Sequence, residues 1–228
     1  MMDNGGTDVT RDEIRRAVKR AILLNEHLLR RAWGILYLAL ALSMFLSIFG
    51  VPIIESLAFA RSFGVLGTIA MDMTASGCGV IAILWAFKRV RNTAEITHPE
   101  DKRAWSGLLG YRFLVPVWVA INGAVISTIV LATSRVPLVD LLLHLGVAVY
   151  LYYALRLSFS KRIAPEGVIA IASLSLSSIV SLALLSITTS PGPYALLWGA
   201  TIVAWIFSGI YARTRPIPEF EEERTGLE

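Results

Sequence analysis

The longest uncharged stretch of this chain lies between Glu166 and Arg213, and it constrains the fold more than any other feature. It contains 46 consecutive residues, 167–212, without Asp, Glu, Lys or Arg. Residues 188–193, Thr-Thr-Ser-Pro-Gly-Pro, interrupt it with a turn signal. Each half approaches the ~20 apolar residues that cross a bilayer core. The stretch therefore predicts a transmembrane hairpin over 168–188 and 194–211.

Four further segments have the length and composition of membrane spans. Segments 32–54 and 113–134 contain no charged residue, 62–87 contains one acid, and 136–155 contains one acid and one histidine. Backbone N–H and C=O groups need partners inside lipid, so helices are the simplest spanning form. We predict an all-α polytopic membrane protein with six transmembrane helices in three outward hairpins, occupying 32–212.

Composition agrees with a membrane location. The chain is 55% hydrophobic and 17% charged, with a mean hydropathy of +0.64, which is too apolar for a soluble domain of 228 residues. Cys78 is the only cysteine, so an internal disulfide is excluded. The first 31 residues are charged and lack an apolar core, so segment 32–54 is predicted to act as an uncleaved signal anchor.

Lys and Arg are divided unevenly between the two sides of the predicted bundle. Of 21 such residues, 19 lie in the N-terminal segment, the second and fourth loops and the tail, and only Arg61 and Arg135 lie in the opposite loops. Cytoplasmic loops carry the excess of positive charge. We therefore expect a cell-membrane protein with both termini in the cytoplasm. Because this rule explains the net charge of +4, no nucleic-acid partner is predicted.

Each helix that returns to the cytoplasm ends in an aromatic residue followed by basic residues. The three clusters are Trp85-Ala-Phe-Lys-Arg89, Tyr152-Tyr-Ala-Leu-Arg156 and Tyr211-Ala-Arg-Thr-Arg215. Aromatic and basic residues both favour the membrane–water interface. This preference accounts for the clusters more simply than the alternative, a triplicated two-helix unit.

A basic amphipathic helix is predicted over 10–31, between a disordered segment 1–9 and the first span. Thr10 and Glu13 form a capping box, and apolar residues recur at helical spacing from Ile14 to Leu28. One interpretation is an interfacial helix that binds anionic lipid through its basic residues. The other is a cytoplasmic extension of the first span that packs on the protein itself. The basic residues are Arg15, Arg16, Lys19 and Arg20. Segment 213–228 is predicted to be a disordered acidic cytoplasmic tail.

Four polar residues within the predicted spans form a candidate intramembrane site: Asp72, Asn122, Asp140 and His144. Ionisable groups are costly in lipid, and each is therefore a functional hypothesis. Asp140 and His144 are four residues apart on one helix face, and Asp72 is predicted at the depth of His144. A carboxylate–imidazole pair suits proton relay or metal ligation. Ordinary pairing at the outer surface or a packed neutral histidine explains the same residues, and no metal or cofactor is predicted.

Small residues recur every four positions on the last two predicted helices. Such spacing allows helices to approach closely, so a packing role is expected. The residues are Ser173, Ser177, Ser181, Ala200, Ala204 and Ser208.

The function predicted from the sequence is transport rather than catalysis, since no nucleotide-binding, hydrolase, metalloprotease or redox motif occurs. The chain is predicted to be a small transporter or the membrane-embedded subunit of a transport complex. The alternative is a structural or regulatory membrane protein that assembles through its small-residue faces with a second copy or a cytosolic partner. A third interpretation is an intramembrane enzyme that uses Asp72, Asp140 and His144.

Overall fold

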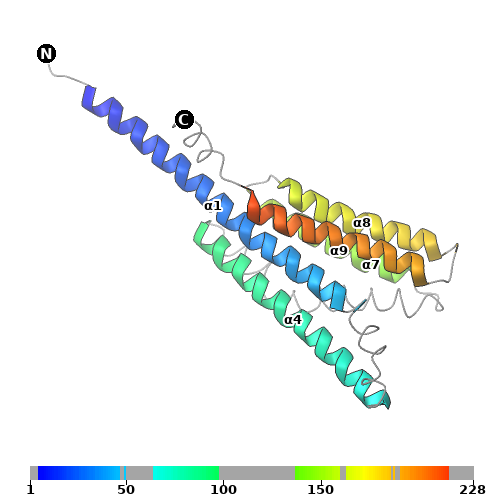
Figure 1. The fold of residues 1–228 in the computed structure, drawn as a ribbon. Coiled ribbons are helices and arrows are strands. Elements are labelled where there is room, and N and C mark those ends of the chain that lie inside the picture. The colour runs from blue at the N-terminus through cyan, green and yellow to red at the C-terminus, as the bar shows by residue number, and fades with distance from the viewer. Residues whose placement is uncertain are drawn as a thin grey trace, which may run out of the picture.

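A computed structural model shows an all-helical fold in the residues that it describes, which are 5–46, 49, 64–97, 137–159, 163–185, 187 and 191–215. This part of the chain contains five helices (Figure 1). They are α1 (Gly5–Phe45), α4 (Gly64–Thr97), α7 (Pro137–Ser158), α8 (Pro165–Leu185) and α9 (Pro191–Thr214). Three of them, α1, α8 and α9, are long and apolar enough to cross a membrane. The predicted all-α class is confirmed for these residues, and a membrane location is compatible with them. The predicted span 113–134 lies outside them.

Prolines set where three of the helices begin. α7, α8 and α9 start at Pro137, Pro165 and Pro191. Proline suits the first helical position because the missing N–H would have no partner there and its φ is already helical. The Pro-Gly-Pro sequence that was expected to lie in the turn before segment 194–211 is therefore the first turn of α9.

The helices pack as neighbours in the order α4, α1, α9, α8 and α7. Figure 1 shows α4 and α9 on either side of α1 and antiparallel to it. α1 and α9 approach closely at two glycines, since a Cβ at Gly34 of α1 would lie 2.8 Å from the carbonyl oxygen of Gly209 of α9. α8 runs antiparallel to α9, and a six-residue connection returns the chain from α7 to α8.

The α8–α9 contact uses hydroxyl groups and tryptophan. Ser177 shares a hydrogen bond with Thr201, and Nε1 of Trp205 donates to the carbonyl of Ala170 at 2.9 Å. Of the small-residue positions on α8, Ser177 and Ser181 are buried and Ser173 is half-buried. On α9, Ser208 is buried, Ala204 is half-buried and Ala200 is exposed. The face of α9 that meets α8 is thus that of Thr201 and Trp205.

α1 is a single helix of 41 residues that projects well beyond the bundle (Figure 1). It begins at Gly5 rather than at Thr10, where the capping box places the start. It also continues without a break into the predicted span, because neither proline nor glycine separates Thr10 from Trp33. We call residues 5–28, which precede the first buried residue Leu29, the α1 extension. The unbroken helix agrees with one part of the second interpretation, but residues 13–22 are exposed and do not pack on the described helices. Contact of this segment with anionic lipid stays a prediction.

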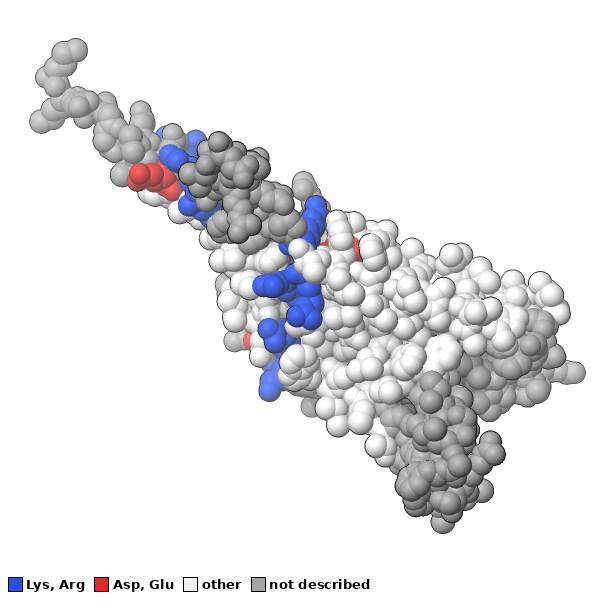
Figure 2. Space-filling view, viewed as in Figure 1, with Lys and Arg blue, Asp and Glu red and all other residues white. Residues whose placement is uncertain are grey.

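On the face drawn in Figure 2, Lys and Arg form a band across one level of the bundle, with an almost uncharged surface on one side and the α1 extension on the other. We call this the basic band. In or just after each of α4, α7 and α9, an arginine contacts the aromatic residue four positions earlier. Arg89 lies over the ring of Trp85 at 5.8 Å, Arg215 lies over Tyr211 at 5.8 Å, and Nη1 of Arg156 donates to Oη of Tyr152 at 3.3 Å. Aromatic–basic pairs of this kind suit a membrane boundary. α4 continues past this level to Thr97, ten residues beyond the predicted end of its span.

Candidate functional site

The polar residues predicted to form an intramembrane site lie on two helices that are not neighbours in the described bundle. Asp72 is in α4, which packs on α1, whereas Asp140 and His144 are in α7, which packs on α8. Asn122 lies outside the described residues. A meeting of Asp72 with His144 therefore stays a prediction. Among the described residues, no group of three His, Cys, Asp or Glu side chains is placed to hold a metal ion.

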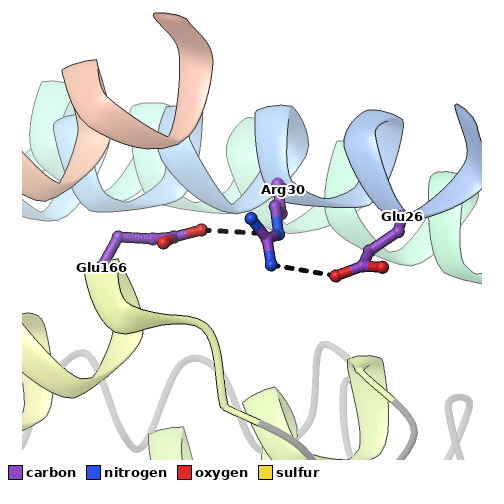
Figure 3. A network of polar contacts seen from close by, with 3 residues as sticks. All are labelled: Glu26, Arg30 and Glu166. Carbon is purple, nitrogen blue, oxygen red and sulfur yellow. Dashed lines mark hydrogen bonds and ion pairs between the residues drawn. The ribbon is translucent and has the colours of Figure 1, made fainter. Parts of the chain in front are cut away.

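The structure instead brings three charged residues together, Glu26 and Arg30 of α1 and Glu166 of α8 (Figure 3). Nη2 of Arg30 donates to Oε1 of Glu26 at 2.9 Å, one turn earlier on α1. On its other side, Nε of Arg30 lies 3.9 Å from Oε1 of Glu166 on α8. Side-chain exposure falls along this series from 43% for Glu26 to 21% for Arg30 and 2% for Glu166. The cluster thus extends from the wet surface of α1 into the bundle.

The start of α8 places the Glu166 carboxylate. Pro165 occupies the first helical position, and the carbonyl of Ala164 accepts hydrogen bonds from the N–H groups of Gly167 at 2.9 Å and Val168 at 3.1 Å. Glu166 is therefore in the first turn, where the positive end of the helix dipole favours a carboxylate. This local field offsets part of the cost of burying the charge.

Four buried polar atoms meet at this position, and two of them are the carboxylate oxygens themselves. Among the described residues, Oε1 and Oε2 of Glu166, Nε of Arg30 and Oη of Tyr37 have no hydrogen-bond partner. Tyr37 reaches the same place because residue 167 has no side chain, since a Cβ there would lie 3.2 Å from Oη of Tyr37. The 3.9 Å separation of Arg30 and Glu166 is an ion pair without a hydrogen bond.

Aromatic residues hold Arg30 and Tyr37 in position. The Arg30 guanidinium lies over the Phe159 ring at 5.9 Å, a cation–π distance. Nε1 of Trp33 donates to Oγ of Ser158 at 2.9 Å, which fixes α1 against the end of α7. The rings of Trp33 and Tyr37 are 6.0 Å apart, within the range of aromatic pairs. The polar cluster therefore stands in a packed frame built from three helices.

This arrangement gathers hydrogen-bond acceptors and donors at one buried position. Buried polar groups without partners are uncommon in proteins, and ordered water or a ligand ordinarily satisfies them. Here the carboxylate of Glu166 supplies acceptors, Arg30 supplies a donor, and the hydroxyl of Tyr37 can act as either. The exposed Glu26 carboxylate, the half-buried Arg30 guanidinium and the buried Glu166 carboxylate form a series from the surface to that position.

Sequence reasoning did not identify this site. Glu166 marked only the edge of the uncharged stretch, and Arg30 was one of the positive charges used for orientation. One signal was available: Glu166 is an acid at the start of the longest apolar segment, in a loop that otherwise contains Arg156, Lys161 and Arg162. Such an acid favours a helix N-terminus, but nothing in its spacing indicates a partner on α1.

Comparisons of the chain with protein-family models, curated proteins and solved structures gave no match. Function is therefore inferred from the residues and their geometry. The described helices define a helical protein with apolar segments suited to a membrane, and within them the Glu26–Arg30–Glu166 cluster joins a buried carboxylate to the surface.

Proposed function

We propose that this chain is a small transporter or the membrane-embedded subunit of a transport complex, with Glu166 as the ionisable group at its cytoplasmic entrance. The observation that carries the proposal is a carboxylate exposed by only 2%, paired at 3.9 Å with Arg30 and without a described hydrogen bond. A bundle that served only as scaffold would gain little from such a group, because an apolar residue of similar size is often equally stable there. Ionisable groups buried in membrane proteins commonly mark pathways for ions or substrates.

The directions of the helices support the six-span threading on which this proposal rests. α4 and α9 run antiparallel to α1, α8 runs antiparallel to α9, and α7 runs antiparallel to α8 (Figure 1). α4 and α7 are consequently parallel to each other. A chain that leaves α4 at one side of a membrane must cross again before it starts α7. The uncharged segment 113–134 is the part of the sequence suited to that crossing.

The structural or regulatory alternative has one observation in its favour. Ile14, Val18 and Ile22 follow one another at intervals of four residues on the α1 extension, and all three are more than half exposed. An exposed apolar face of this kind suits a protein partner. The two functions differ in whether water reaches Glu166, since transport requires access to the site and assembly does not.

Access can be measured by thiol labelling of Glu166→Cys in a Cys78→Ala background. In inside-out vesicles we expect a charged, impermeant maleimide to modify Glu166→Cys faster than the matched variant Ser177→Cys. Both positions are buried on α8, but Ser177 lies about 16 Å deeper along the helix. Equally slow modification at the two positions would contradict the transport proposal and favour the structural alternative.

A further inference from the structure

The α1 extension carries a strong local charge. Between Ile14 and Leu24 it has four basic residues and no acidic one. We call these residues, Arg15, Arg16, Lys19 and Arg20, the basic face; all are exposed. The segment 216–228 that follows α9 has the opposite charge, with five Glu and one Arg, a net charge of −4. We propose that Glu221–Glu223 of this acidic tail dock on the basic face of the α1 extension.

Helical phase places part of the basic face in line with α9. Gly34 and Leu38 are the α1 residues that meet Gly209 of α9. Arg16 and Arg20 precede them by 18 residues each, which is about five complete turns of an α-helix. The side of α1 that packs on α9 inside the bundle thus continues beyond it as Arg16 and Arg20. Of the four residues of the basic face, Arg16 and Arg20 are therefore the two on the side along which a segment leaving α9 in the direction of that helix would run.

The length of the tail fits this path. Cγ of Arg213 lies 3.0 Å from the position of a Cβ on Gly34, which sets the level at which α9 ends along α1. Measured from Arg215, which lies about 3 Å beyond Arg213, Arg20 is about 18 Å and Arg16 about 24 Å farther along the α1 axis. An extended chain covers about 3.3 Å per residue, so Glu221 and Glu223 reach about 20 and 26 Å beyond Arg215.

The composition of the tail favours such an extended approach. Pro216 and Pro218 cannot continue the α9 helix, and their fixed φ favours extended backbone. Single exposed ion pairs are weak, but several pairs on a tethered segment act at a high effective concentration. The predicted competitor is anionic lipid, which would use the same four basic residues. The inference is independent of Glu166 and of transport.

Distances between spin labels test the proposal in the full chain. Labels at Glu13→Cys and Thr225→Cys, in a Cys78→Ala background, report the separation of the α1 extension and the tail. We expect a narrow, short-distance distribution in phosphatidylcholine vesicles and in vesicles containing phosphatidylglycerol. The triple variant Glu221→Gln, Glu222→Gln, Glu223→Gln should lose the short distances.

Charge exchange separates a specific contact from a change in folding. Replacing Glu221, Glu222 and Glu223 with Arg should abolish the short distances, and adding Arg16→Glu with Arg20→Glu should restore them. The control Arg11→Gln, on the opposite side of the helix from Arg16 and Arg20, should leave them unchanged. A broad distribution in the parent, or equal distributions in the parent and the triple Gln variant, would overturn the proposal. Loss of the short distances in anionic vesicles alone would assign the basic face to lipid and would also overturn it.

Discussion

Arg30→Met is expected to lower the free energy of unfolding by about 3 kcal/mol, the lower part of the range for breaking a buried ion pair. Methionine keeps the apolar stem of Arg30 and removes the guanidinium that faces Glu166. The loss arises because the Glu166 carboxylate, exposed by only 2%, remains in the bundle without its counter-charge. The long 3.9 Å separation and the partial exposure of Arg30 keep the value below the top of the range. Unfolding in detergent measures the effect.

Two further variants test whether the uncompensated charge of Glu166 causes the loss of stability in Arg30→Met. Glu26→Gln removes only the exposed partner of Arg30 within the same helix, so a loss below about 0.5 kcal/mol is expected. Adding Glu166→Gln to Arg30→Met should recover part of the stability, because no uncompensated charge then stays buried. If Arg30→Met and Glu26→Gln unfold identically, the buried pair has no energetic role and its assignment is wrong.

Gly209→Val is expected to disrupt the packing of α9 on α1, with a cost at or above the upper end of the ~1–3 kcal/mol typical of overpacking. A Cβ at residue 209 would lie 2.6 Å from Cγ of Leu38 and 2.8 Å from the carbonyl oxygen of Gly34. The second obstacle is backbone, so a side-chain rotation cannot relieve it. Thermal unfolding in detergent is the measurement.

Gly146→Val on α7 is the matched control, because a Cβ there would have no atom of the described residues within 4 Å. A change within about 0.5 kcal/mol is expected for such a surface position. Equal melting of the two glycine variants would show that α1 and α9 are not packed through Gly34 and Gly209.

The elements that the sequence predicted best are those with uniform composition. α8 and α9 lie within three residues of the predicted segments 168–188 and 194–211, because loss of charge and the intervening turn residues mark both ends. The start of α1 was less predictable. The capping box at Thr10 is a local signal, and the helix extends beyond it to Gly5.

Tertiary pairing accounts for what the sequence did not reveal. Small residues at Ala200 and Ala204 allow close packing, but their spacing does not say which helix they face, and the structure turns Thr201 and Trp205 toward α8 instead. Arg30 and Glu166 are each explained locally, by the positive-inside rule and by a helix N-terminus. Their pairing depends on α1 and α8 being brought together, which no local pattern specifies.

The central claim is that the basic band marks the cytoplasmic side of a membrane bundle that contains Glu166. The most direct test uses an impermeant thiol reagent on intact cells, with Ile187→Cys or Thr214→Cys as the only cysteine in a Cys78→Ala background. Ile187, 79% exposed after the end of α8, and Thr214, the exposed last residue of α9, lie at opposite ends of the bundle. We predict labelling of Ile187→Cys in intact cells and of Thr214→Cys only after permeabilisation. Labelling of Thr214→Cys in intact cells would contradict the orientation and, with it, the cytoplasmic entrance proposed for Glu166.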